Sequence, residues 1–244
     1  MTRRRWIAEE ASGNRAALTG EHAAHLARVL RARVAEEFDI ATPQGVRRGR
    51  ITSITAARVE FELGDAVEAL PARPVTILLA IFKFDRYEWA IEKLTELGVA
   101  SIVPVIAERT DAHLAKASAK RAERWRRVAL SAAEQSRRTA PPEIGEPVRL
   151  EESLAGHGLR IVLAEPGAEA EQAASLLDLV NAGTHDAPLT LAIGPEGGWT
   201  PRELDRFCQA GWQSASLGRL VLRAETAAIA AAAIAAAFEV KQKS

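Results

Sequence analysis

Two consecutive stretches near the carboxyl end of the chain repeat one pattern: a short apolar run, a glycine loop and a helix. The first stretch opens with Leu189–Ile193, which is typical of a buried strand and is closed by the loop GPEGG. Thr200–Glu203 has the form of a capping box with proline at the first helical position, and it predicts a helix after the loop. That helix is expected to bury three residues: Leu204, Phe207 and Cys208.

The second stretch, Ala215–Val240, follows the same plan, with a short strand, a turn at Gly218 and a long alanine-rich helix. Glu196, Arg223 and Glu225 lie in or beside the two loops. Glycine lets a ligand approach the backbone closely, and ligands of open α/β sheets bind beyond the carboxyl ends of the strands. The loops therefore predict a ligand site. A plain turn for the first loop, and a carboxylate that stabilises the helix dipole for Glu225, are the alternatives.

From Val75 onwards, apolar strands alternate with helices. The apolar runs predict strands at Val75–Ile81, Ser101–Ile106 and Leu159–Ala164, and the helical periodicity predicts helices at Asp85–Leu97, Ala119–Ser136 and Glu171–Val180. Buried apolar strands that are joined by helices indicate a parallel α/β sheet. The pattern by itself favours an ordinary doubly wound fold.

The first 70 residues have a different character, with short β-type segments around one helix. The predicted strands are Arg4–Ala8, Glu36–Ala41, Arg47–Thr55 and Arg58–Leu63, and the predicted helix is Glu21–Arg31. Two prolines, Pro71 and Pro74, disfavour regular structure and predict a linker at residues 71–74. We therefore expect a small β-barrel domain at residues 1–70 and a second domain at residues 75–244.

Charge is balanced over the whole chain but uneven along it. The chain holds 32 Lys and Arg against 32 Asp and Glu, so the net charge indicates no particular partner. Residues 109–138, however, hold nine basic side chains against three acidic ones, and this segregation favours an anionic partner for that segment.

Several classes of protein are disfavoured by the sequence. The single cysteine, Cys208, excludes an internal disulfide and is typical of a reducing cytoplasm. The first ten residues lack the apolar core of a signal peptide, and the uncharged run Thr226–Phe238 is shorter than the roughly 20 residues of a membrane span. No dinucleotide-binding or Walker A motif occurs, and the histidines lack metal-ligand spacing. We expect a cytoplasmic protein with no membrane and no metal partner.

Further motifs occur in the same order along the chain: HLARVLR (His25–Arg31), FKFDRYEWAIEKLTELGV (Phe82–Val99), ERT (Glu108–Thr110) and KRAERWRRVALSAAEQSRR (Lys120–Arg138). With GPEGG and LGRLVLRAETA, they resemble the bacterial 16S ribosomal RNA (uracil-N3)-methyltransferases of the knotted SPOUT class. The resemblance spans nearly the whole chain. One departure is Leu220, which stands where the family usually has arginine, with Arg219 one place earlier.

The resemblance implies a fold and a cofactor. The fold is a carboxy-terminal SPOUT-type parallel sheet with a deep trefoil knot, preceded by a small PUA-like β-barrel that binds RNA. The cofactor is S-adenosylmethionine, whose adenine would bond to backbone groups among Leu217, Val221 and Leu222. The implied cofactor-binding residues are Leu163, Ala164, Glu165, Ile193, Gly194, Pro195, Gly197, Gly198, Leu217, Gly218, Val221, Leu222 and Thr226.

Relatives of this class pair through helices close to the cofactor. The alanine-rich helix Glu225–Val240 offers more small apolar surface than one helix face normally buries, and small side chains allow close helix approach. A homodimer is therefore expected.

The implied reaction attacks a sulfonium methyl group with N3 of uracil. The neutral N3–H is a poor nucleophile, so its proton must leave before or during transfer, and a nearby cation can stabilise the resulting anion. We expect Arg223 to supply that cation. Glu225 or Glu196 would orient the base, orient Arg223 or accept the proton, and the sequence leaves these three roles open.

The implied substrate is 16S ribosomal RNA or the small ribosomal subunit, with the target uridine unpaired or flipped. Ten basic residues are expected to contact its phosphates: Arg28, Arg31, Lys83, Arg86, Arg109, Lys120, Arg124, Arg127, Arg137 and Arg138. Simple surface solvation is the competing explanation for each. Two other functions are weighed: a sister SPOUT enzyme acting on another RNA position or atom, which Leu220 favours, and a non-catalytic RNA-binding assembly factor, which the intact loop motifs disfavour.

Overall fold

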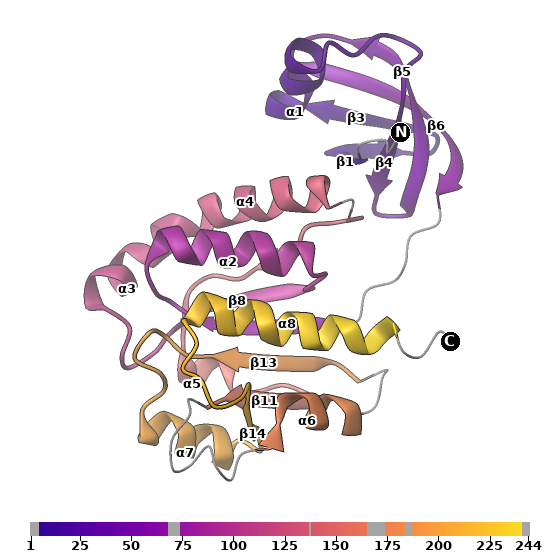
Figure 1. Ribbon diagram of the computed structural model, residues 1–244. Helices are drawn as coiled ribbons and strands as arrows, with labels where there is room; N and C mark the ends of the chain where they lie inside the picture. Colours follow the sequence, from indigo (N-terminus) through magenta and orange to yellow (C-terminus); the bar gives the residue numbers. More distant parts are fainter. Residues whose placement is uncertain (1–4, 68–73, 137, 165–173, 184–186, 241–244) are drawn as a thin grey trace. The chain divides into compact units, whose positions relative to one another are not determined.

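The computed structural model describes residues 5–67, 74–136, 138–164, 174–183 and 187–240 (Figure 1). Contacts divide the chain into two compact units. Residues 1–71 and 130–141 form the first unit, and residues 72–129 and 142–244 form the second. Of the expected linker at residues 71–74, only the last residue lies within the described ranges.

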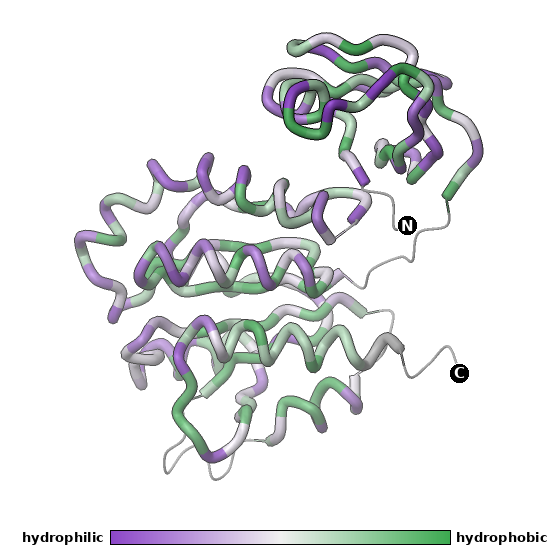
Figure 2. The backbone as a smooth tube through the Cα atoms, turned by 45° about the horizontal axis from the view of Figure 1, so that its top comes forward, coloured by the Kyte–Doolittle hydropathy of each residue, from purple (hydrophilic) through white to green (hydrophobic). Residues whose placement is uncertain are grey.

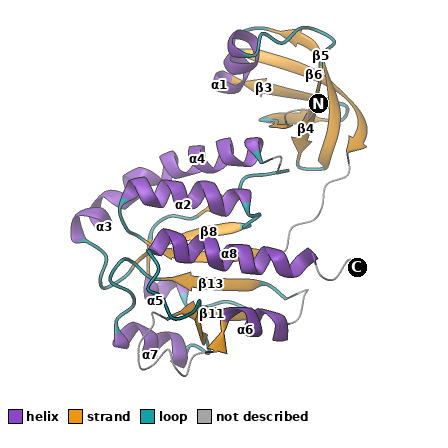
Figure 3. Cartoon of the chain, in the orientation of Figure 1, coloured by secondary structure: helices purple, strands orange, loops and turns teal. Residues whose placement is uncertain are grey.

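The first unit is built on a mixed sheet (Figure 3). The strand order of this sheet is β1-β4-β5-β6-β3-β2. Its strands are β1 (Arg5–Ile7), β2 (Glu10–Ser12), β3 (Arg15–Thr19), β4 (Glu37–Thr42), β5 (Gly45–Ile54) and β6 (Arg58–Val67). β1 and β4 are parallel, and the other pairs are antiparallel. The four predicted strands are confirmed as β1, β4, β5 and β6. The short strands β2 and β3 were not predicted, because their residues carry little apolar alternation.

The predicted helix of this unit is α1 (Gly20–Ala24) followed by the π-helical turn His25–Val29. It ends two residues before the predicted boundary, and Arg31 beyond it has a positive φ of 51°. Large side chains at the centre of its core include Trp6, Leu18, Leu26, Ile40 and Phe61, all at most 1% exposed.

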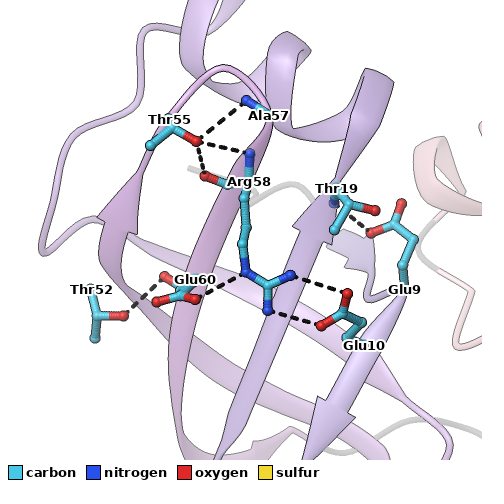
Figure 4. Close-up of polar contacts among 8 residues, drawn as sticks. All are labelled: Glu9, Glu10, Thr19, Thr52, Thr55, Ala57, Arg58 and Glu60. Atoms are coloured by element: carbon cyan, nitrogen blue, oxygen red, sulfur yellow. Dashed lines mark hydrogen bonds and ion pairs between the residues drawn. The ribbon is translucent and has the colours of Figure 1, made fainter.

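Ion pairs connect strands on one face of this sheet (Figure 4). The guanidinium of Arg58 donates to both carboxylate oxygens of Glu10 at 2.8 and 3.1 Å and to Glu60 at 3.0 Å. The bond from Arg58 lowers the pKa of Glu10. Since all three side chains are exposed, the pairs contribute little to stability by themselves.

His22 of α1 forms a more sheltered pair in the same unit. Its Nδ1 contacts a carboxylate oxygen of Glu9, whose other oxygen accepts the backbone N–H of Thr19 at 3.0 Å. Its Nε2 lies 3.5 Å from Glu134, on the part of α4 (Ala122–Gln135) that belongs to this unit. The hydrogen bond to Glu9 raises the pKa of His22, against partial burial and with help from Glu134.

The second unit contains a parallel sheet in the order β10-β8-β7-β13-β11-β14-β12, with β9 paired to β8. Its strands are β7 (Val75–Ala80), β8 (Ser101–Ile106), β9 (Glu143–Ile144), β10 (Val148–Arg149), β11 (Leu159–Leu163), β12 (Ala174–Ser175), β13 (Leu189–Ile193) and β14 (Gln213–Ser216). Every pair is parallel, as the sequence predicts.

Helices cover both faces of this sheet (Figure 1). They are α2 (Phe84–Glu96), α3 (Ala112–Ser118), α4, α5 (Leu150–Ser153), α6 (Leu176–Ala182), α7 (Pro201–Gln209) and α8 (Ala224–Val240). Ile77 and Leu79 of β7 pack in the core that α2, α4, α6 and α8 share, whereas Leu78 and Ala80 pack with residues of α5 and α7. This burial on both faces explains why the strands are continuous apolar runs.

Some boundaries differ from the prediction. The predicted helix Ala119–Ser136 begins as a 3-10 turn at Ala119–Arg121 and continues as α4, and α3 before it was not predicted. Much of the predicted helix Glu171–Val180 lies outside the described residues. Figure 2 shows α8 in mostly green, hydrophobic colour, in line with its alanine-rich sequence. No helix in the described ranges combines the length and apolar character that a membrane crossing requires.

The His22 pair predicts a pH-dependent stability. Because the folded pKa lies above the unfolded value of 6.5, the stabilisation is fully present below pH 6.5 and is lost as the pH rises through the folded pKa. Urea unfolding of His22→Ala should therefore differ from the parent chain most at pH 6, with the difference shrinking towards pH 8.5. His157→Ala, at an exposed site, is the matched control. A difference that stays constant with pH would contradict this role of the His22 charge.

Candidate functional site

A cleft lies at the carboxyl edge of the second unit's sheet, where the loops after β11, β13 and β14 meet. These strands are parallel, and β11 pairs with both β13 and β14, so their loops begin side by side. The cleft encloses about 520 Å³, its open mouth included. Its lining residues are Leu163, Ala164, Ile193, Gly194, Pro195, Gly198, Trp199, Leu217, Gly218, Leu220, Leu222, Ala224 and Ala227.

The structure brings together most of the residues expected to bind a cofactor. Those that line the cleft are Leu163, Ala164, Ile193, Gly194, Pro195, Gly198, Leu217, Gly218 and Leu222. Gly197, Val221 and Thr226 lie in the same segments but do not line it, and Glu165 is outside the described residues. The sequence reasoning did not include four lining residues: Trp199, Leu220, Ala224 and Ala227. Two of them, Ala224 and Ala227, are small residues three apart in the first turn of α8, and this spacing is a signal that the sequence does contain.

Main-chain groups and apolar side chains form the walls, so the two glycine loops determine the shape of the cleft. A Cβ at Gly194 would lie 3.2 Å from the backbone nitrogen of Trp199, and Gly218 has a φ of 121°, which side chains rarely tolerate. The first loop is closed by a hydrogen bond from Gly198 N–H to the Pro195 carbonyl at 2.8 Å. Larger side chains at Gly194 or Gly218 would therefore distort the wall.

The predicted capping box of α7 is present and extends beyond the helix. Thr200 Oγ1 accepts the N–H of Glu203 at 3.2 Å, and Glu203 accepts the N–H of Thr200 at 2.8 Å. The second carboxylate oxygen of Glu203, which is 1% exposed, accepts the N–H of Glu108 at 2.8 Å. Thr200 Oγ1 also donates to Glu108 at 2.9 Å. A buried donor that loses its partner costs about 1–3 kcal/mol. Because the Glu203 carboxylate accepts the N–H groups of Thr200 and Glu108, it holds the loop before α7 and the turn after β8 in place.

The prediction that α7 buries Cys208 is wrong, since this side chain is exposed. Glu203 and Phe207, four residues apart, form the inward face, where Phe207 packs edge-on against Trp199 and Trp212. Cys208 lies about 100° further round the helix and therefore points away from that face.

The model of one protein family, described as the RNA methyltransferase domain, matches residues 68–236 of this chain. The chain belongs to this family. The match includes the three segments that form the cleft.

Named relatives of this RNA methyltransferase share most of its length. It is similar to "Ribosomal RNA small subunit methyltransferase E" of Synechocystis sp., with 33% identity over 215 residues that cover 86% of this chain and 69% of the relative. A solved structure with the same name, from Neisseria gonorrhoeae, is described as bound to S-adenosyl methionine. It matches with a TM-score of 0.81 and 28% identity, and the match covers 95% of this chain and 96% of the relative's chain. A putative methyltransferase of Legionella pneumophila, described as in complex with the cofactor SAM, has a TM-score of 0.83 and 28% identity, with 98% of each chain covered.

The three expected catalytic residues of this methyltransferase lie in different environments. Glu196 and Arg223 are exposed, and the carbonyl of Arg223 accepts the Ala227 N–H at 2.8 Å at the start of α8. Glu225 is 4% exposed, and its Oε1 lies 3.7 Å from Nε of Arg86 on α2. Its Oε2 is buried and accepts no hydrogen bond from the described part of the chain. Arg86, expected at RNA phosphates, thus faces a buried carboxylate.

The other basic residues of this methyltransferase also divide by environment. Lys83, Lys120, Arg124 and Arg127 are all exposed. Arg124 differs in that it donates to Glu88 at 2.6 Å, which raises the pKa of Arg124. Burial lowers the pKa of Arg138.

The remaining expected RNA contacts lie elsewhere. Arg28 and Arg31 are exposed in the first unit, and Arg137 is outside the described residues. Arg109 donates to the backbone carbonyl of Gly197 in the GPEGG loop and to that of Trp199, which follows the loop. Within the described ranges, no group of three or more His, Cys, Asp and Glu side chains is placed to hold a metal ion.

Proposed function

We propose that this chain transfers the methyl group of S-adenosylmethionine to N3 of a specific uridine in the 16S ribosomal RNA of the small subunit. The main support for this proposal is the cleft that the glycine loops line at the edge of the sheet. The fold that carries this cleft matches the solved Neisseria gonorrhoeae relative with a TM-score of 0.81. The names of the relatives support ribosomal RNA as the substrate. Methylation of another RNA position or atom is the second candidate, favoured by Leu220 at the mouth of the cleft in place of the family's arginine.

The side chains that line the cleft are small or apolar, which suits a flat ring whose polar edge bonds to main-chain groups. We propose that the lining residues hold it, with backbone groups among Leu217, Val221 and Leu222 bonded to the adenine and with Gly197, Thr226 and Glu165 beside it. Bound S-adenosylmethionine supplies an electrophilic methyl group on a sulfonium. As the bond from uracil N3 to that methyl group forms, the bond from sulfur to methyl breaks, and the N3 proton leaves to a base or to water.

Arg223 is proposed to stabilise the negative charge that develops on the uracil carbonyl oxygens. Its exposed position at the start of α8, next to a lining residue, lets it reach a base that enters the cleft from outside. Glu196 is exposed on the first loop and can orient the base or accept its proton. The buried Glu225, which faces Arg86 at 3.7 Å, is better placed to hold side chains in position.

We further propose the finer features of the fold. The strand order, with β13 between β7 and β11, is compatible with the trefoil knot of the SPOUT class. Residues 1–70 would form the PUA-like RNA-binding domain, residues 71–74 the linker and residues 75–244 the methyltransferase domain. The protein would act in the cytoplasm, where ribosomal RNA is modified.

The function is tested by Arg223→Ala. We expect single-turnover methylation of ribosomal RNA to fall by about 10²–10³, the typical cost of losing one electrostatic partner of a transition state. Calorimetry should show nearly unchanged cofactor affinity, because backbone groups hold the cofactor. Arg223→Lys should recover part of the rate, since an ammonium cannot match a carbonyl edge with a planar fork.

Two controls accompany this test. Arg202→Ala, at an exposed site on α7, should methylate normally. Mass spectrometry of the digested RNA decides between 3-methyluridine and another methylated nucleoside. If Arg223→Ala loses cofactor affinity while its bound fraction reacts normally, Arg223 belongs to the cofactor site and the catalytic assignment is wrong.

Lys120 and Arg127 are proposed RNA contacts on the exposed side of the segment that leads into and along α4. The double variant Lys120→Ala/Arg127→Ala should weaken RNA binding and reduce the slope of log K against log salt by about 0.7–0.9 per lost phosphate contact. Lys93→Ala is the control, because its ammonium is already paired with Glu92 at 2.7 Å and Glu96 at 2.8 Å. An unchanged slope in the double variant would place the RNA on another surface.

A homodimer is proposed from exposed apolar surface beside the cleft. Leu220 and Val221 are 79% and 72% exposed, and Ile229 and Ile234 on α8 remain half-buried. Large exposed apolar groups that cluster near one site are typical of interfaces. Sedimentation equilibrium should give twice the 26.3 kDa chain mass, and Val221→Glu should shift the mass towards one chain. Val34→Glu, at another exposed valine, should leave the mass unchanged; a monomeric parent chain would refute the dimer.

A further inference from the structure

Arg109 contacts the wall of the cleft, although the sequence placed it among RNA-binding residues. It lies in the turn after β8 and comes from a different βα unit than the loop it contacts. Its Nη1 donates to the carbonyl of Gly197 at 2.5 Å and lies 3.4 Å from the carbonyl of Trp199. Gly198, which lines the cleft, is the residue between these two carbonyls. One guanidinium therefore spans the segment of the loop that forms the wall.

The loop is shaped to receive this side chain. A Cβ at Gly197 would lie 3.3 Å from Cδ and 3.7 Å from Cβ of Arg109. The aliphatic stem of Arg109 therefore packs on the loop where Gly197 has no side chain. A side chain at position 197 would therefore crowd the stem of Arg109.

Arg109 projects from a turn that is itself fixed. Ala107 N–H donates to Thr110 Oγ1 at 3.1 Å, Thr110 N–H donates to the Ala107 carbonyl at 3.1 Å, and Thr110 Oγ1 donates to the Ile81 carbonyl at 3.3 Å. The N–H of Glu108 is held by the buried carboxylate of Glu203. The turn thus provides a rigid base from which the guanidinium holds a glycine-rich segment.

We propose that Arg109 is a positioning residue for the cofactor cleft: it holds Gly197–Trp199 in the conformation that receives S-adenosylmethionine. This inference rests on the proposed function. A loop with three glycines in five residues loses much conformational freedom on ordering, and hydrogen bonds from a charged donor order it before the cofactor binds. Without Arg109, the loop would become ordered only when the cofactor binds, and the entropy lost in that step would weaken cofactor binding.

The test compares full-length Arg109→Ala and Arg109→Lys with Arg126→Ala. Arg126 is a matched control, because it also donates to a backbone carbonyl, that of Ile144 at 3.3 Å, but away from the cleft. Calorimetry should show cofactor binding weakened about ten- to hundredfold in Arg109→Ala, which corresponds to about 1.4–2.7 kcal/mol. Arg109→Lys should lose less, since its ammonium keeps a charged donor for these carbonyls but lacks the planar shape of the guanidinium.

Kinetics separate positioning from the alternatives. With saturating cofactor and RNA, Arg109→Ala should keep a kcat close to that of the parent chain while its KM for the cofactor rises, and its salt dependence of RNA binding should not change. Unchanged cofactor affinity with a flatter salt slope would overturn the proposal in favour of an RNA contact. A lower Tm with normal cofactor affinity of the folded protein, in both Arg109 variants, would overturn it in favour of a purely structural role. If the parent chain itself bound no cofactor, the proposed function would fail first.

Discussion

The parallel pairing of β13 on both of its sides is the constraint on which the site depends. Its residues pair with β7 from Leu189 opposite Val75 to Ile193 opposite Leu79, and Leu191 pairs with Ile161 of β11. The backbone hydrogen bonds fix the register of neighbouring strands. The loops after β11, β13 and β14 therefore start at the same edge of the sheet and enclose one cleft. The register also decides which side chains meet which helices, since a slip by one residue exchanges the two faces of a strand.

The same edge contains charged groups whose partners come from distant parts of the chain. Glu203 is a buried carboxylate, and burial of a charge is costly unless hydrogen bonds compensate for it. Here it accepts the N–H groups of Thr200 and Glu108, and it thereby joins the start of α7 to the turn after β8. Arg109 adds bonds from that turn to the glycine loop. The loop would be mobile by its own sequence, and its order therefore depends on tertiary contacts.

These contacts explain how far the sequence could predict the structure. Apolar runs identify a strand that is buried on both faces, and a capping box specifies a helix start within a few residues, so β13 and α7 were predictable from local pattern. The pairing of Arg86 with Glu225 joins residues in the first turns of two helices far apart in sequence, and no local pattern encodes it. The prediction for Cys208 was wrong because the inward face of α7 is formed by Phe207 together with Glu203, a carboxylate that does not mark a buried position in an apolar pattern.

The structure also changes how the basic segment 109–138 should be understood. Its excess of positive charge predicts an anionic partner, but several of its arginines already have partners within the protein. Arg121 and Arg124 share Glu88, and Arg126 lies between Glu123 and Glu146. A phosphate that approaches such a paired guanidinium must compete with a carboxylate, so it gains less than at an exposed lysine. The attraction of this segment for RNA should therefore be concentrated at fewer positions than the charge count suggests. Arg109, too, already donates to the carbonyls of Gly197 and Trp199.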